Sequence, residues 1–153
     1  GVSTSEAKSY VDSYFAQFPR VRACLDGILE QARRSREVTT LFGRVRPIPD
    51  IAASNPNVRG NAERMALNAP FQGAAADIIK IAMVRLDRAL TERRLASRLV
   101  LQVHDELVFC IPDDQVEDAR RIITQEMTRP LPWMLELPLA VEIKQGSNYG
   151  SCE

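Results

Sequence analysis

Apolar residues recur at helical spacing in the first third of the chain. Ser3 and Glu6 have the spacing of a capping box, in which each satisfies a backbone N–H of the other at a helix start. An apolar stripe follows and predicts a helix over residues 4–18. A proline at position 19 can open the next helix, and its periodic apolar residues predict a second helix over residues 19–35.

Three more segments show the same helical period. Residues 56–69 and 74–95 carry apolar stripes, and Pro70 lies between them. Proline removes a backbone donor and clashes with the preceding turn, so we expect a kink or a break there. Residues 114–128 predict another amphipathic helix, with Asp113 as its N-cap.

Other segments alternate as strands do. Residues 37–50 predict a small basic hairpin that turns at Gly43, and residues 138–144 alternate loosely enough to predict a strand. Residues 129–136, which include Trp133, are predicted to be a proline-broken connector. With the predicted helices, these segments indicate an α+β fold in which helices pack on a small antiparallel sheet.

One polar triplet interrupts the most apolar stretch. Residues 99–103 and 107–111 read as two strands of a hairpin, with His104, Asp105 and Glu106 at its tip. Burying the carboxylates there costs several kcal/mol per ion, as an order of magnitude, unless something pairs with them. A divalent metal ion is one such partner. The alternative is a solvated polar turn.

Composition changes this picture in one respect. The 153 residues have no net charge, but residues 1–100 carry 16 Lys and Arg against 10 Asp and Glu, and residues 101–153 carry 4 against 10. A basic part beside an acidic part suits a protein that binds a polyanion and also holds cations. The alternative is an imbalance that folding mixes together.

The remaining composition excludes some classes. Three cysteines, far apart and without a C-x-x-C pair, argue against a disulfide framework or zinc knuckle and fit a reducing compartment. No apolar run approaches the ~18 residues of a membrane span, and no signal peptide is visible at the start. We therefore expect no membrane partner.

A second group of polar residues recurs every four positions. Arg64, Asn68 and Gln72 stand at i, i+4 and i+8, which places them in one row on a helix. Each donates two or more hydrogen bonds, and every base pair presents acceptors in the minor groove. Such a row could hold a duplex by shape without reading its sequence. The alternative is an exposed polar stripe. The small residues from Gly73 to Ala76 would let another backbone approach closely.

These motifs together resemble a known family. Residues 63–80 (ERMALNAPFQGAAADIIK), followed about 25 residues later by residues 102–108 (QVHDELV), are similar to the C-terminal part of family A DNA polymerases of the bacterial DNA polymerase I type. Residues 14–21, 40–51 and 146–149 match the family in order and spacing. The resemblance covers essentially the whole chain.

The resemblance implies roles for individual residues. Asp105 would be a ligand of the two catalytic Mg²⁺ ions, Glu106 would lie beside them, and His104 would lie near the primer terminus. Template and primer would be contacted along the minor groove by the helical donors Arg64, Asn68 and Gln72. The basic hairpin and the Arg-rich second helix would lie near duplex phosphates.

The resemblance also implies an activity. The primer 3′-hydroxyl would attack the α-phosphate of a dNTP, with two metal ions stabilising the attacking and leaving oxygens. Residues 1–55 would derive from the fingers and residues 56–153 mainly from the palm. The implied partners are primer–template DNA and dNTP. We expect a monomer in the bacterial cytoplasm, associated with the nucleoid.

Two family motifs are missing from the sequence. The strand motif Asp-Tyr-Ser-x-Ile-Glu-Leu-Arg with the other metal-binding Asp is absent, as is the fingers helix that grips the triphosphate. We expect the chain to begin just after that helix, to be inactive alone, and to leave Asp105 and Glu106 exposed without a tightly held metal. Two alternatives are a duplex-binding module with a vestigial Asp105, and a metal-dependent hydrolase using His104, Asp105 and Glu106.

Overall fold

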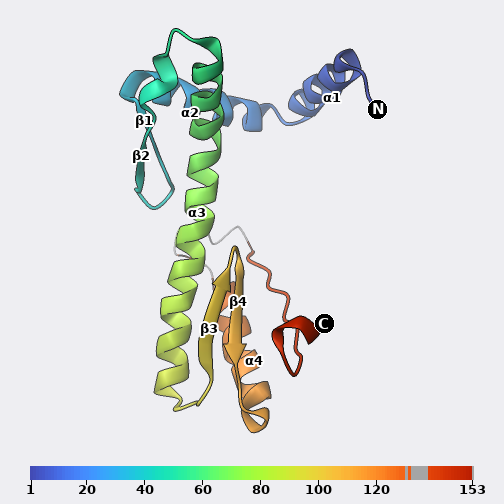
Figure 1. Cartoon of the computed structure of the whole chain (residues 1–153), viewed down its shortest axis with the longest axis vertical. Coiled ribbons are helices and arrows are strands. Elements are labelled where there is room, and N and C mark those ends of the chain that lie inside the picture. Colours follow the sequence, from blue (N-terminus) through green and yellow to red (C-terminus); the bar gives the residue numbers. More distant parts are fainter. Residues whose placement is uncertain (130, 132–137, 153) are drawn as a thin grey trace. The chain divides into compact units, whose positions relative to one another are not determined.

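The computed structural model describes residues 1–129, 131 and 138–152 and has an α+β fold, as the sequence indicates (Figure 1). Helices and two antiparallel hairpins alternate along the chain. The elements in order are α1 (Thr4–Gln17), α2 (Pro19–Ser35), β1 (Glu37–Thr39), β2 (Val45–Pro47), the 3₁₀ helix η1 (Pro49–Ala52), α3 (Pro56–Glu92), β3 (Arg98–Val103), β4 (Glu106–Cys110), η2 (Asp113–Gln115), α4 (Val116–Thr128) and η3 (Tyr149–Ser151).

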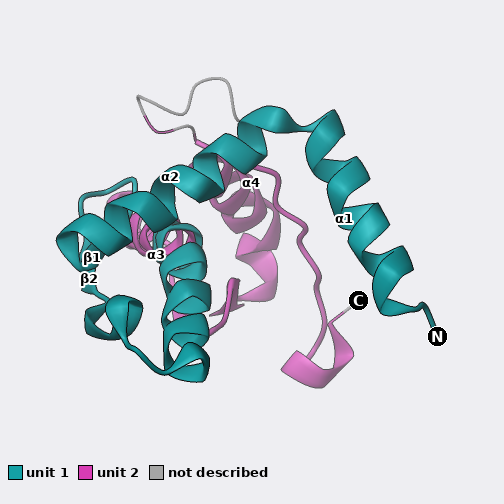
Figure 2. Ribbon diagram, turned by 90° about the horizontal axis from the view of Figure 1, so that it is seen from above, with its two compact units in different colours: residues 1–74 teal, residues 75–153 magenta. Residues whose placement is uncertain are grey.

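The chain divides into two compact units, residues 1–74 and residues 75–153 (Figure 2). The long helix α3 contributes to both. The proposed assignment of residues 1–55 to fingers and 56–153 to palm is a different division, and it stays a prediction.

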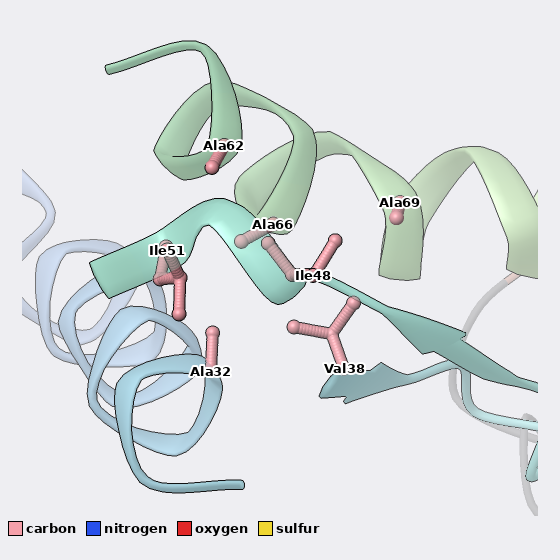
Figure 3. Packing of buried hydrophobic residues seen from close by; sticks show 7 residues of the cluster. All are labelled: Ala32, Val38, Ile48, Ile51, Ala62, Ala66 and Ala69. Carbon is pink, nitrogen blue, oxygen red and sulfur yellow. The ribbon is translucent and has the colours of Figure 1, made fainter. Parts of the chain in front are cut away.

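The first unit has a core of small and β-branched side chains. Helix α2, the β1–β2 hairpin, η1 and the first half of α3 converge on it (Figure 3). Its buried members are Ala32, Val38, Ile48, Ile51, Ala62, Ala66 and Ala69. The alanines of both helices keep those helix faces narrow, so the hairpin and η1 can pack closely between them.

Helix α1 confirms its predicted start. The Ser3 hydroxyl accepts from the Glu6 N–H, and the Glu6 carboxylate accepts from the Ser3 N–H at 2.8 Å. All residues of Thr4–Gln17 are nevertheless exposed except the half-buried Phe15. The apolar stripe of α1 therefore has the predicted spacing but is largely exposed. The Tyr14 and Phe18 rings lie 5.0 Å apart, and the Arg22 guanidinium lies 5.1 Å from the centre of the Phe15 ring.

The second unit is built around larger side chains. The second half of α3, the β3–β4 hairpin and α4 surround a buried cluster, and partly buried residues such as Leu107 and Phe109 pack against it. The buried members are Leu86, Leu90, Ala119, Ile122 and Ile123. The apolar stripe predicted for residues 114–128 therefore points into this core.

Helix α3 continues through Pro70 as one helix, so of the expected kink or break, the break does not occur. A proline inside a helix costs about 3 kcal/mol because it removes one hydrogen bond and clashes with the turn before it. Ala66 and Ala69 are buried on one side of Pro70 and Ile79 on the other. Tertiary packing of both flanking segments offsets the local cost.

Two further expectations were wrong. Residues 138–144 form no strand, although Ile143 still packs against the core of the second unit. Asp113 does not cap α4: it opens η2, and α4 begins three residues later with Gln115 at the N-cap position. The Gln115 side chain instead accepts from the Ala96 N–H at 2.8 Å.

The connector predicted for residues 129–136, with Trp133, lies almost entirely outside the described residues.

Candidate nucleic-acid interface and acidic turn

The β3–β4 hairpin presents the polar triplet at its tip, as predicted. Val103 pairs with Glu106, so His104 and Asp105 form a two-residue turn between the strands. The pairing shifts register between Leu99 and Leu101, which marks a bulge in β3.

The strands beside the turn are less buried than their composition predicts. Leu107 and Phe109 of β4 pack against the core of the second unit. Val100 and Leu101 of β3, in contrast, keep 57% and 48% of their surface exposed. The hairpin is therefore buried on one face and exposed on the other, although its apolar sequence is typical of buried strands. The sequence of an apolar strand does not reveal whether one or both of its faces are covered by other elements.

The backbone of the turn is unusual at His104. Its φ is +55°, in the left-handed region that glycine adopts readily and most other residues do not. Among residues 103–106 it alone has a positive φ, which is the pattern of a type II′ hairpin turn. Glycine is preferred at that position, so the sequence carries local strain where the candidate chemistry lies.

The two carboxylates at the turn face solvent. His104, Asp105 and Glu106 are all exposed, which confirms the expectation that this chain would leave the carboxylates outside its core. Within the described part of the chain, no three His, Cys, Asp or Glu side chains gather closely enough to hold a metal ion. A self-contained hydrolase site built from the triplet therefore has no support in the geometry.

The predicted donor row lies on the exposed side of α3. Arg64, Asn68 and Gln72 are all exposed. On the buried side of the same helix, the small residues Ala62, Ala66 and Ala69 pack into the core of the first unit. The helix thus separates a packing face from a polar face. The Arg64 guanidinium donates to the Asn61 side chain on that polar face.

Gly73, which follows the last residue of the donor row, lies in close contact with the β1–β2 hairpin. A Cβ atom built on Gly73 would collide with the side-chain methyl of Thr40 from the β1–β2 hairpin. The Thr40 hydroxyl accepts from the N–H groups of Phe42 and Arg44, at 3.3 and 3.2 Å, which fixes its rotamer. The small residues after Gln72 were expected to admit another backbone, and here one of them admits a side chain.

Two arginines of the predicted phosphate-binding surface also make polar contacts within the first unit. Arg33 forms an ion pair with Glu63 of α3 at 2.8 Å, and Arg36 donates to the Pro49 carbonyl at 3.1 Å.

The difference in net charge is smaller between the two compact units than between residues 1–100 and residues 101–153 of the sequence. Residues 1–74 carry 10 Lys and Arg against 7 Asp and Glu, and residues 75–153 carry 10 against 13.

Sequence reasoning gave no role to Gln102. Its side-chain Nε2 donates to the His104 carbonyl oxygen at 3.2 Å, across the turn. The sequence does show a glutamine two positions before the turn residue His104. The turn type and the hydrogen bond, however, depend on the pairing register of β3 with β4, which the sequence does not reveal.

Comparisons with known proteins agree with this architecture. The family model for DNA polymerase family A matches residues 1–151. The chain is 44% identical over 149 residues to DNA polymerase I of Lactococcus lactis subsp. cremoris, and 45% identical over 148 residues to DNA polymerase I of Mycobacterium tuberculosis. Both alignments cover 97% of this chain but only 17% and 16% of those proteins.

A solved structure shows the same fold. The polymerase domain of Pol1 from M. smegmatis, in complex with DNA primer–template and dNTP, superposes with a TM-score of 0.84 at 42% identity. The match covers 91% of this chain and 24% of that one. The α+β fold described here thus matches a segment of that polymerase domain, and the chain belongs to DNA polymerase family A. It spans about one sixth of the length of these relatives.

Among the described residues, no helix combines the length and the apolar character needed to span a bilayer.

Proposed function

We propose that this chain is the C-terminal fingers and palm segment of a DNA-directed DNA polymerase. Its activity in the complete protein would be template-directed transfer of a nucleotide from dNTP to a primer 3′-hydroxyl, in replication or repair. The observation that carries the proposal is the exposed turn of His104, Asp105 and Glu106, in a chain that matches family A polymerases over residues 1–151.

Asp105 is the residue proposed to bind metal. Family A DNA polymerases are in general metal-dependent, and the exposed carboxylates at this turn supply the hard oxygen ligands that Mg²⁺ prefers. Bound Mg²⁺ would stabilise the charge that develops on the attacking and leaving oxygens. Glu106 would orient water beside Asp105, and His104 would contact the primer terminus. One turn supplies too few protein ligands for a two-metal site, so we propose that the 153-residue chain alone has little or no activity.

The donor row is proposed to position the duplex. Arg64, Asn68 and Gln72 would donate to acceptors that every base pair presents in the minor groove. Because these donors lie on a helix whose opposite side is buried, the row can meet a duplex with little reorganisation. Arg64 would have to exchange its contact with Asn61 for a contact with DNA.

Partners and setting follow from the same proposal. We propose primer–template DNA and dNTP as partners of the complete protein, acting as a monomer. M. smegmatis Pol1, the structural relative, is described in complex with DNA primer–template and dNTP. The relatives named above are bacterial, which supports a cytoplasmic, nucleoid-associated location.

A chimera tests the proposal. The 149-residue segment of the L. lactis polymerase that aligns with this chain would be replaced by this chain. We expect the chimera to extend a primer, and the isolated 153 residues to do so no better than their Asp105→Asn variant. Templated synthesis by the isolated chain, abolished by Asp105→Asn, would contradict the inactive-fragment part. A folded chimera that binds primer–template DNA but extends no primer would support a duplex-binding module instead.

A further inference from the structure

The tip of the β3–β4 hairpin holds a polar contact for which neither the fold nor the proposed chemistry accounts. Gln102 Nε2 donates to the His104 carbonyl oxygen at 3.2 Å, and both residues are exposed. A single hydrogen bond between neutral groups is a small part of the stability of a whole fold. Its position is more informative than its energy, because it acts on the peptide group between His104 and Asp105.

That peptide group is the central peptide of the turn. Its orientation is set by ψ of His104 and φ of Asp105, so it helps to decide where the Asp105 side chain is directed. Turn types that differ mainly in the orientation of this peptide have different φ and ψ at the two central residues. A turn whose central peptide rotates would therefore present Asp105 in more than one direction.

The sequence does not favour the observed orientation by itself. His104 holds φ at +55°, where a glycine would be favoured and a histidine is strained. Strain of this kind persists only when the surroundings impose it. Pairing of Val103 with Glu106 closes the turn, and the Gln102 side chain makes a polar contact with its central peptide.

We propose that Gln102 is a positioning residue, which braces the strained turn so that Asp105 keeps one orientation. The proposal rests on the proposed function in one respect, namely that Asp105 binds metal. Gln102 itself touches neither metal nor substrate in this proposal. It acts through the backbone of His104 and would lower the metal concentration at which the turn becomes productive.

The test uses the chimera and a substitution that removes only the donor. Gln102→Met keeps the length of the side chain and is uncharged, but it cannot donate to the carbonyl. We expect the Mg²⁺ concentration for half-maximal single-turnover rate to rise about 3- to 10-fold, the range expected for loss of one neutral hydrogen bond. The affinity for primer–template DNA should change less than twofold. Gln125→Met, at an exposed glutamine of α4, is the matched control and should leave both values unchanged.

Rescue distinguishes bracing from a general effect on the fold. In a His104→Gly background the turn adopts the positive φ without strain, so the brace is less needed. We expect Gln102→Met to shift the Mg²⁺ dependence less than twofold there. An equal shift in both backgrounds, or a lower melting temperature with unchanged Mg²⁺ dependence, would overturn the proposal.

A second readout does not depend on activity. Amide hydrogen exchange at Asp105 and Glu106 in the 153-residue chain reports local opening of the turn. Gln102→Met should speed this exchange about 3- to 10-fold, with no change at Leu86 in the core. If the chimera is inactive while Gln102→Met speeds the amide exchange, the proposed function is wrong but the positioning role of Gln102 is supported. If exchange does not change, the brace is wrong whether or not the chimera is active.

Discussion

The two halves of helix α3 pack in opposite ways. In residues 1–74 the helix buries alanines against a hairpin, and a methyl group of Thr40 occupies the space beside Gly73. In residues 75–153 it buries Leu86 and Leu90 among isoleucines. At Gly73 the first half leaves no room for an added methyl group, and the second half depends on large side chains. One helix thus forms, with the alanine-packed core of the first unit, a platform that carries the donor row, and it also contributes large side chains to the core of the second unit.

The largest effect is expected from removing volume in the second half. Leu86 has no exposed surface, so Leu86→Ala should lower the free energy of unfolding by about 2–5 kcal/mol, through lost burial and a residual cavity. Urea denaturation of the 153-residue chain measures this change. Val84→Ala is the control, since Val84 is exposed on the same helix and should cost below about 0.5 kcal/mol. Equal losses would contradict the packing described for this half.

The opposite substitution tests the first half. Gly73→Ala adds a Cβ that collides with Thr40, and overpacking of this kind costs about 1–3 kcal/mol, partly offset by alanine's better helix propensity. Gly60→Ala is the matched control: the added Cβ meets nothing within 4 Å there. It should stabilise the helix by about 0.5–1 kcal/mol. Parallel urea titrations of both variants would refute the close contact if Gly73→Ala were the more stable.

The platform should act on DNA through its exposed face. Asn68→Ala and Gln72→Ala in the chimera should each weaken binding of primer–template DNA about 3- to 10-fold, the range expected for one lost hydrogen bond. The loss should not depend on sequence, because the minor-groove acceptors are common to all base pairs. Fluorescence anisotropy with duplexes of different sequence measures it. Thr91→Ala, exposed near the end of the same helix, should have no effect.

The smallest effect concerns helix α1. Hydrogen bonds from the Ser3 hydroxyl, and then from the Ser3 N–H, lower the pKa of Glu6 below its ordinary value of 4.5. A lowered pKa means that the capping interaction stabilises the helix above pH 4.5 and is lost as the pH falls through the folded-state value. Amide chemical shifts of residues 4–7 should therefore report fraying in acid. The Glu6→Gln variant should show no such transition.

The sequence predicted the elements whose signals are local. The capping box at Ser3, the proline at the start of α2 and the turn at Gly43 each correspond to an observed boundary or turn. Expectations went wrong where tertiary packing decides. A kink or a break was expected at Pro70, but α3 is continuous there, with buried residues on both sides of the proline. Residues 138–144 alternate, yet form no ladder.

The candidate site divides in the same way. The spacing of Arg64, Asn68 and Gln72 was enough to place them on one exposed helix face. The apolar run around His104 correctly predicted a hairpin, but not that its β3 residues would remain half exposed. The brace by Gln102 depends on the sign of one backbone angle, which residue types alone do not reveal.

The central claim is that the turn at Asp105 supplies one part of a polymerase site. The most direct test is the single-turnover rate of nucleotide incorporation by the chimera with and without Asp105→Asn, at saturating Mg²⁺. Loss of a metal ligand that stabilises charge in the transition state is worth several kcal/mol, so we predict a fall of about a thousandfold. Affinity for primer–template DNA should stay within twofold. A rate that falls less than tenfold would contradict the claim.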